Sequence, residues 1–195
     1  MVTAHSGADA LTHAIESYLS KDASIATEPF SLQAIALIAR GLARAYRDGS
    51  DLDAREQTQL GATLAMIAGM NAHMGLCHAL IMPLCARYHI PHGRACGMTL
   101  PAVLEFNVRT HGAKVAEIFR ALGLLATEAA LSPLCYEGLR RFFSDLGIDS
   151  RLRDYHYRAA DRDLIILETL ASVQCRYNPT QPTAAEVAYI LERLI

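Results

Sequence analysis

Two pairs of side chains in this sequence could bind one divalent metal together. Asp9 and His13 are four residues apart in the segment GADALTHAIES, so on a helix they project from the same face. His78 and His92 belong to the segment GLCHALIMPLCARYHIPHG, in which polar side chains are set among apolar ones. One carboxylate and three neutral imidazoles are borderline ligands, which suit Fe²⁺ or Zn²⁺ better than Mg²⁺ or Ca²⁺.

Each of the four residues also has a purely structural interpretation. Asp9 could stabilise the first turn of a helix that Ser6 caps, and His13 could have a backbone partner. His78 is flanked by apolar residues, where a buried imidazole needs either a metal or a hydrogen bond to offset its desolvation. His92 could be an exposed loop residue. These interpretations stay open at the level of single residues.

The PHG turn offers a way to aim His92. Pro91 restricts the residue before it, and Gly93 can adopt a positive φ that lets the backbone turn tightly. His73 and His89 are further histidines nearby, which rank below His78 and His92 as ligands.

The composition of the chain argues against several classes of protein. The chain has 195 residues, of which 52% are hydrophobic and 19% charged, and its net charge is −2. The apolar share supplies a substantial core, and the absence of a basic segment argues against nucleic-acid binding. No apolar run reaches the ~18 residues of a membrane span, and the N-terminus lacks the pattern of a signal peptide. We therefore expect a cytoplasmic protein that binds neither nucleic acid nor membrane. Its cysteines are odd in number, form no CxxC motif and should be reduced thiols: Cys77, Cys85, Cys96, Cys135 and Cys175.

The spacing of hydrophobic residues and the residues typical of helix starts and ends predict helices nearly everywhere and no strand. A helix that begins beside Pro29 carries apolar residues at spacings of three and four, and the second half of the helix over 52–72 should be buried. The expected helices cover 7–19, 28–47, 52–72, 75–88, 99–107, 114–122, 127–146, 164–173 and 184–194. This pattern predicts a single all-α domain over residues 1–195.

The segments GADALTHAIESY, NAHMGLCHALIMPLCARYHIPHG and LPAVLEFN resemble the C-terminal domain of iron-containing (group III) alcohol dehydrogenases. The closing segment NPTQPTAAEVAYILERLI is similar to the end of that family, so the resemblance covers essentially all 195 residues. It implies a helical bundle whose metal, Fe²⁺ or Zn²⁺, is held by Asp9, His13, His78 and His92. It also implies a NAD(P)-dependent oxidoreductase in which the metal polarises an alcohol or carbonyl oxygen for hydride transfer. The substrate would be a small alcohol or aldehyde.

Two departures from the family pattern stand out. The family has an N-terminal domain with a glycine-rich turn for NAD(P), whereas this sequence has no GxGxxG or Walker loop. We expect that domain to be missing or supplied in trans, the isolated chain to be inactive, and the uncovered face to favour a homodimer. The family also carries a histidine near the nicotinamide where this chain has Met82, and a glycine where it has Cys85. Methionine cannot relay protons, so we assign no catalytic side chain.

Other classes fit less well. A truncated or degenerate homologue that binds a metal or a partner without catalysis remains the main alternative. A metal-dependent hydrolase of the all-α His-Asp class needs an adjacent His-Asp pair, and the sequence contains none. A lyase similar to dehydroquinate synthase would share the architecture, but the PHG block and the Asp9–His13 pattern fit the dehydrogenases better.

Overall fold

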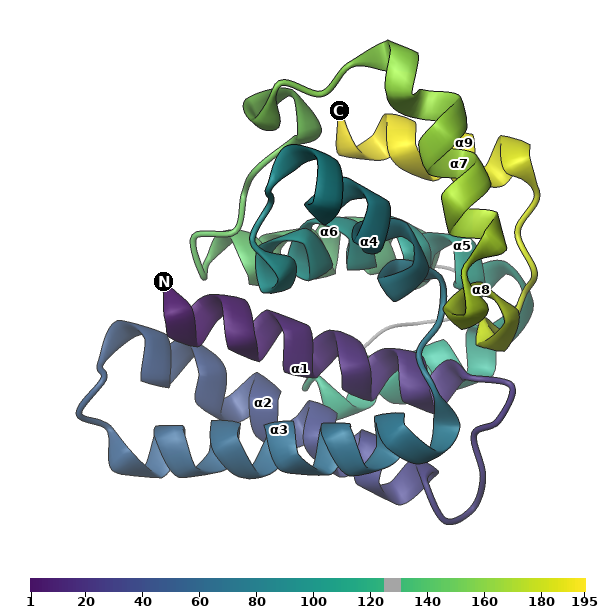
Figure 1. The fold of residues 1–195 in the computed structure, drawn as a ribbon. Helices are drawn as coiled ribbons and strands as arrows, with labels where there is room; N and C mark the ends of the chain where they lie inside the picture. The colour runs from purple at the N-terminus through teal and green to yellow at the C-terminus, as the bar shows by residue number, and fades with distance from the viewer. Residues whose placement is uncertain (125–130) are drawn as a thin grey trace.

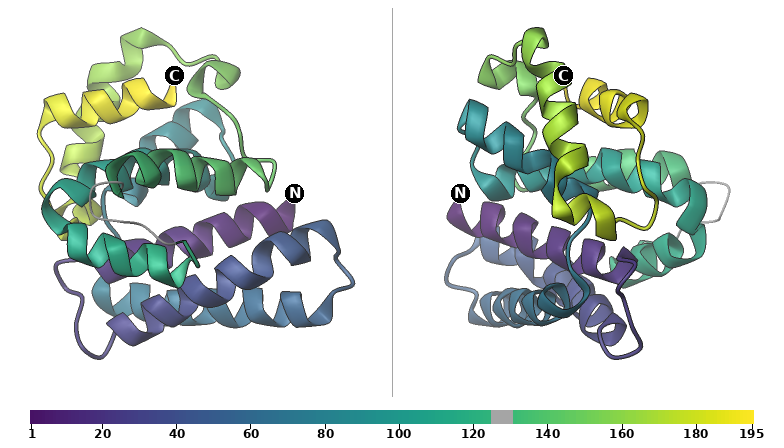
Figure 2. Two further views of the ribbon diagram at one scale, coloured as in Figure 1. Left: turned by 180° about the vertical axis from the view of Figure 1, so that it is seen from behind. Right: turned by 45° about the vertical axis from the view of Figure 1, so that its right-hand side comes forward.

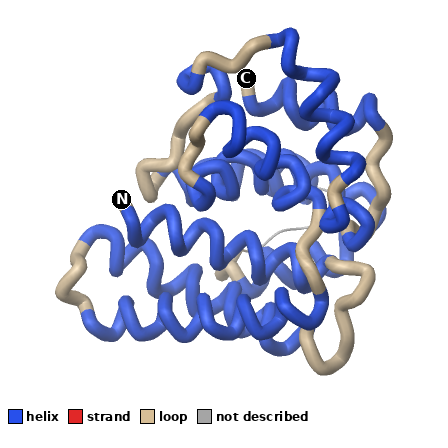
Figure 3. Tube along the Cα trace, in the orientation of Figure 1, coloured by secondary structure: helices blue, strands red, loops and turns tan. Residues whose placement is uncertain are grey.

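The computed structural model describes residues 1–124 and 131–195, and consists of α-helices connected by loops (Figures 1 and 3). No strand occurs in these ranges, which confirms the predicted all-α class. Within the same ranges no single helix is long and apolar enough to cross a membrane; one pair, α3 with α4, meets that test only jointly and is bent by 102°.

Three long helices form the lower half of the molecule as drawn in Figure 1. They are α1 (Val2–Leu19), α2 (Glu28–Arg47) and α3 (Leu52–Ala72). α2 and α3 pack against each other, and α1 lies on both of them. α2 begins beside Pro29 as predicted, because proline has no N–H to lose in a first helical turn.

The upper half packs on the other side of α1. It contains α4 (Leu76–Tyr88), α5 (His92–Ala121) and α6 (Leu131–Ser144). The C-terminal elements lie above these helices in Figure 1, and Figure 2 shows them from two further sides. They are η2 (Leu152–Tyr155), η3 (Ala159–Asp161), α7 (Arg162–Ala171), α8 (Val173–Tyr177) and α9 (Ala184–Leu194). α1 and α4 both contact α5, so the side chains of three helices meet in the centre of the molecule.

The predicted start of the first helix was wrong. α1 begins at Val2, and the Ser6 hydroxyl donates to the Val2 carbonyl inside the helix, 2.9 Å away, rather than capping its start. Burial of Ala4 and Ala8 on one face makes the additional turn favourable. As a result Asp9 lies beyond the first turn of α1, and the helix dipole does not account for it.

The second half of α3 is buried only along its small residues, so the prediction of general burial was wrong. Gly61, Ala65 and Ala68 are buried, whereas the larger Met66 and Met70 are exposed. Small side chains allow α3 to approach its neighbours closely, which turns the larger ones outward.

Helix boundaries in the second half of the chain also differ. α5 joins the two helices predicted over 99–107 and 114–122, with a kink at His111 (φ −126°, ψ 36°) between them. The helix predicted over 164–173 ends at Ala171, because the backbone at Ser172 is extended, and α8 follows. The start predicted at residue 127 lies outside the described residues. α9 has the predicted bounds, and Thr183 forms a capping box with Glu186.

Candidate metal centre

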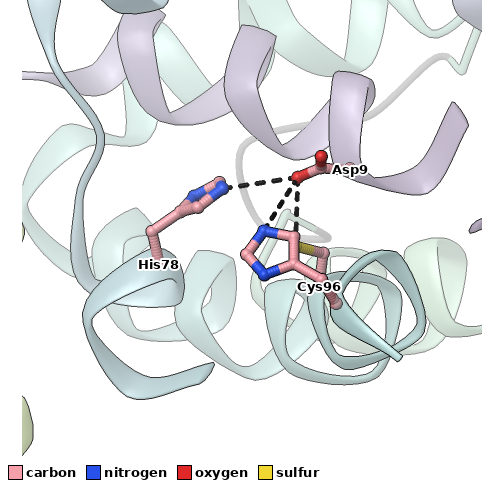
Figure 4. A group of neighbouring side chains, drawn as sticks. Asp9, His78 and Cys96 are labelled. Atoms are coloured by element: carbon pink, nitrogen blue, oxygen red, sulfur yellow. Dashed lines mark hydrogen bonds and ion pairs between the residues drawn. The ribbon is translucent and has the colours of Figure 1, made fainter. Parts of the chain in front are cut away.

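All four predicted ligands come together around one carboxylate oxygen. Asp9 Oδ1 lies 3.2 Å from His13 Nδ1, 3.4 Å from His78 Nε2 and 3.4 Å from His92 Nε2. Asp9 and His13 lie on α1, His78 lies on α4, and His92 is the first residue of α5. The cluster is thus formed by residues of three helices. Figure 4 shows His78 directed at the Asp9 carboxylate.

A third residue of α1, Glu16, fixes the orientation of His78. Glu16 Oε2 accepts from His78 Nδ1 at 2.6 Å, and the same carboxylate accepts from the backbone N–H of Cys77 at 2.6 Å and of His78 at 3.3 Å. The residue is only 3% exposed. Glu16 therefore caps the N-terminus of α4 and orients the imidazole on it.

Asn178 also holds the start of α4. Asn178 Oδ1 accepts from the Leu76 N–H at 3.1 Å, and Asn178 exchanges side-chain hydrogen bonds with Asn107. A Cβ at Gly75 would lie 2.8 Å from Asn178 Oδ1 and 3.0 Å from Glu16 Oε1. Glycine at this position lets both side chains reach the helix end.

The chemistry of His78 fits a metal. Because Nδ1 donates to Glu16, Nε2 is the nitrogen that faces Asp9 and is the one available to a metal once its proton is lost. That Nε2 atom is buried and has no hydrogen-bond partner of good geometry. A buried imidazole nitrogen without a hydrogen-bond partner carries a desolvation cost that a metal ion would offset.

The charges of the cluster favour a cation at its centre. Burial acts to raise the pKa of Asp9, but close contacts with the three histidines outweigh it and hold that pKa well below its usual range. Burial acts to lower the pKa of His78, but Asp9 and Glu16 outweigh it and raise the pKa to about 9. Asp9, Cys85 and Cys96 raise the pKa of His92 to about 12. Without a metal, protons gather around Asp9, and a divalent cation would replace them.

His92 is positioned by backbone contact instead of by a second carboxylate. The predicted reason for Gly93, a positive φ, was wrong: Gly93 lies inside α5, and a Cβ there would collide with the carbonyl oxygen of His5. Glycine is needed so that α5 can approach α1 at this point. The His92 side chain remains 42% exposed.

Sequence analysis missed two members of the site, Glu16 and Cys96. Glu16 is seven residues after Asp9 and three after His13, and Cys96 is four after His92, so helical spacing could have revealed both. The ligand atoms of Asp9, His78, His92 and Cys96 all lie within 4.8 Å of one another. Cys96 Sγ donates to Asp9 Oδ1 at 3.4 Å, and burial raises the pKa of the thiol to about 12.

The other residues singled out from the sequence lie around this group. Met82 is 55% exposed and lies one turn after His78 on α4. His73 stacks on Tyr177 with ring centroids 4.1 Å apart, and His89 is an exposed residue with positive φ at the end of α4. Neither histidine joins the metal-ligand group found among the described residues.

Comparison with known proteins gives consistent results. The Fe-containing alcohol dehydrogenase family, C-terminal, matches residues 3–195. The 1,3-propanediol dehydrogenase of Citrobacter freundii is 36% identical over 98% of this chain and 50% of that protein. The NADPH-dependent butanol dehydrogenase of Clostridium saccharobutylicum is 33% identical over 98% of this chain and 50% of that protein. The crystal structure of a 1,3-propanediol oxidoreductase superposes with a TM-score of 0.94 at 34% identity, over 98% of this chain and 51% of that one. The chain thus spans about half the length of the relatives it matches.

Proposed function

This chain belongs to the Fe-containing alcohol dehydrogenase family and corresponds to its C-terminal helical domain. From that premise we propose that it is the metal-binding part of an NAD(P)-dependent oxidoreductase acting on small alcohols or aldehydes. Asp9, His13, His78 and His92 would hold the ion, which is Fe²⁺ or Zn²⁺ by the chemistry of the donors.

The observation that carries this proposal is the convergence of three histidines on Asp9 Oδ1. In particular, His78 Nε2 is buried without a partner while Nδ1 is held by Glu16. A histidine that serves only the fold would be expected to use both nitrogens. The arrangement of imidazole and carboxylate is the one in which an outer carboxylate orients a metal ligand.

The residues of this chain supply position and charge. Glu16 holds Nδ1 of His78, and the contact of Gly93 with α1 places His92 beside Asp9. When bound, a divalent metal supplies Lewis-acid polarisation of an alcohol or carbonyl oxygen. The half-exposed His92 leaves one side of the cluster accessible to a small molecule.

We further propose that the nicotinamide nucleotide binds mainly to the half of the relatives that this chain does not span. Fluorescence titration of the purified chain with NADH should then show no saturable binding. Tight NADH binding would contradict this assignment, because it would place a complete nucleotide site within the helical domain.

The metal assignment is tested by titration calorimetry of the metal-free chain with Zn²⁺ and, without oxygen, with Fe²⁺. We expect about one ion per chain, and a loss of affinity of more than about tenfold in His78→Ala, since even the loss of an outer-shell partner costs 10–100-fold. His156→Asn is the matched control, because His156 is exposed with a positive φ that asparagine tolerates. Unchanged affinity in His78→Ala would refute the site.

A further inference from the structure

Cys96 is a buried residue whose sulfur could bind a metal, and the proposed function gives it no role. It lies one turn after His92 on α5, is fully buried, and places Sγ 3.4 Å from Asp9 Oδ1. Figure 4 shows His78 and Cys96, which come from separate helices, both directed toward the Asp9 carboxylate. The thiol therefore faces the same carboxylate oxygen as the orphaned His78 Nε2.

We propose that Cys96 is a further ligand of the bound metal and binds through Sγ as a thiolate. This inference rests on the proposed function, since it requires an ion at Asp9. On binding, the S–H bond breaks, the proton passes to solvent, and a bond forms between Sγ and the metal, with no change of oxidation state. Among the resulting five ligands, the compact group of Asp9, His78, His92 and Cys96 offers one oxygen, two nitrogens and one sulfur, and His13 adds a third nitrogen.

The compactness of this group supports the assignment. Its four ligand atoms lie within 4.8 Å of one another before any ion is bound, so small side-chain movements would bring them to one centre. His13 is outside this group, and its Nδ1 donates to the backbone carbonyl of Asp9 at 3.0 Å while also facing Oδ1. Cys96 thus belongs to the compact group, whereas one of the predicted ligands does not.

The remaining cysteines near the centre have other surroundings. Cys77 Sγ donates to the backbone carbonyl of Cys96 at 3.8 Å, and Cys85 is partly exposed on α4 and contacts His92. Among the described cysteines, only Cys96 belongs to the metal-ligand group. Cys85 is therefore a matched control: it lies beside the same histidine but outside the group.

A thiolate ligand has a consequence for metal choice. Thiolate is a soft donor that favours zinc, whereas hard ions such as Mn²⁺ prefer carboxylate and water. Removing the sulfur should therefore weaken Zn²⁺ binding more than Mn²⁺ binding. A merely structural cysteine would not change the ratio of the two affinities.

The experiment is optical spectroscopy of the full chain loaded anaerobically with Co²⁺, followed by competition with Zn²⁺ and Mn²⁺. We expect a sulfur-to-cobalt charge-transfer band in the near ultraviolet for the wild-type chain. The band should disappear in Cys96→Ser and persist in Cys85→Ser. The Zn²⁺ affinity of Cys96→Ser should fall by at least about tenfold, the lower range for outer-shell partners. Circular dichroism melting confirms that each variant is folded.

The outcomes separate the two proposals. Stoichiometric Co²⁺ without the band in the wild-type chain would overturn the role of Cys96 and leave the metal site intact. A band that is lost in Cys85→Ser but kept in Cys96→Ser would also overturn it. If the wild-type chain bound no metal, the proposed function itself would fail, and the inference with it.

Discussion

The candidate metal centre has two unlike sides, here called the buried wall and the open wall. The buried wall consists of His78 with Glu16 and the start of α4, where backbone and side-chain polar groups are paired and nearly sealed from solvent. The open wall consists of His92 and Gly93, where the imidazole is 42% exposed and its placement depends on contact between two helix backbones.

This difference separates two tasks. The buried wall is held by hydrogen bonds within the protein, because one carboxylate accepts from both the helix end and the imidazole. The open wall contributes less to the fold and lies where a small molecule could enter. We therefore expect substitutions in the buried wall to lower the free energy of unfolding, and those in the open wall to act mainly on metal binding.

The largest effect is expected for Glu16→Ala. Removing the carboxylate leaves two backbone N–H groups and His78 Nδ1 without their partner, so the free energy of unfolding should fall by about 3–5 kcal/mol. Urea unfolding followed by circular dichroism measures it. The exposed Glu56→Ala is the control and should change stability by less than about 0.5 kcal/mol. Equal stability of the two variants would mean that these hydrogen bonds do not hold the buried wall.

Gly93→Ala should have a smaller effect. The added Cβ meets the His5 carbonyl, so α1 and α5 must move apart, at a cost of about 1–3 kcal/mol in unfolding free energy. Zn²⁺ affinity should fall as well, because His92 moves with the helix start. Gly112→Ala is the matched control on the same helix: its Cβ would meet open space, and the variant should gain up to about 1 kcal/mol. Destabilisation by both substitutions would argue against a specific close approach.

His92→Ala separates folding from binding. In the metal-free chain the half-exposed contact of His92 with Asp9 contributes at most about 1 kcal/mol, so chemical unfolding should change little. Zn²⁺ affinity, measured by calorimetry on the same sample, should nevertheless fall by more than about tenfold. A loss of stability as large as that of Glu16→Ala would remove the distinction between the walls.

Met82→Leu should have the smallest effect. The side chain is 55% exposed and leucine has nearly the same volume, so the unfolding free energy should change by less than about 0.5 kcal/mol. Zn²⁺ affinity should also be unchanged. A marked loss of affinity would show that the thioether acts as a ligand, and that the exposed side of α4 belongs to the site.

Much of the fold was predictable because helical periodicity and the signals for helix starts and ends depend on residues that are close in the sequence. Pro29 marked the start of α2, and the bounds of α3 and α9 were predicted correctly. The errors arose where contacts between residues distant in the sequence determine the helix bounds. Ala4 extends α1 only because it is buried among other helices, and Ser172 interrupts a helix that its own sequence would continue.

The site shows the same division. Sequence analysis identified Asp9 and the three histidines that gather around it, because their spacing occurs within two recognisable segments. It did not reveal that Glu16 reaches across to α4, sixty-one residues ahead at Cys77, because that contact depends on how the helices cross. Nor did it reveal the reason for Gly93, which is a backbone on another helix.

The most direct test is a crystal structure of the chain loaded with one equivalent of Zn²⁺, with the ion located by anomalous scattering. The account predicts one peak about 2.0–2.2 Å from Asp9 Oδ1, His78 Nε2 and His92 Nε2, joining α1, α4 and α5. A fully occupied zinc ion bound elsewhere, with His78 Nε2 left free, would contradict it.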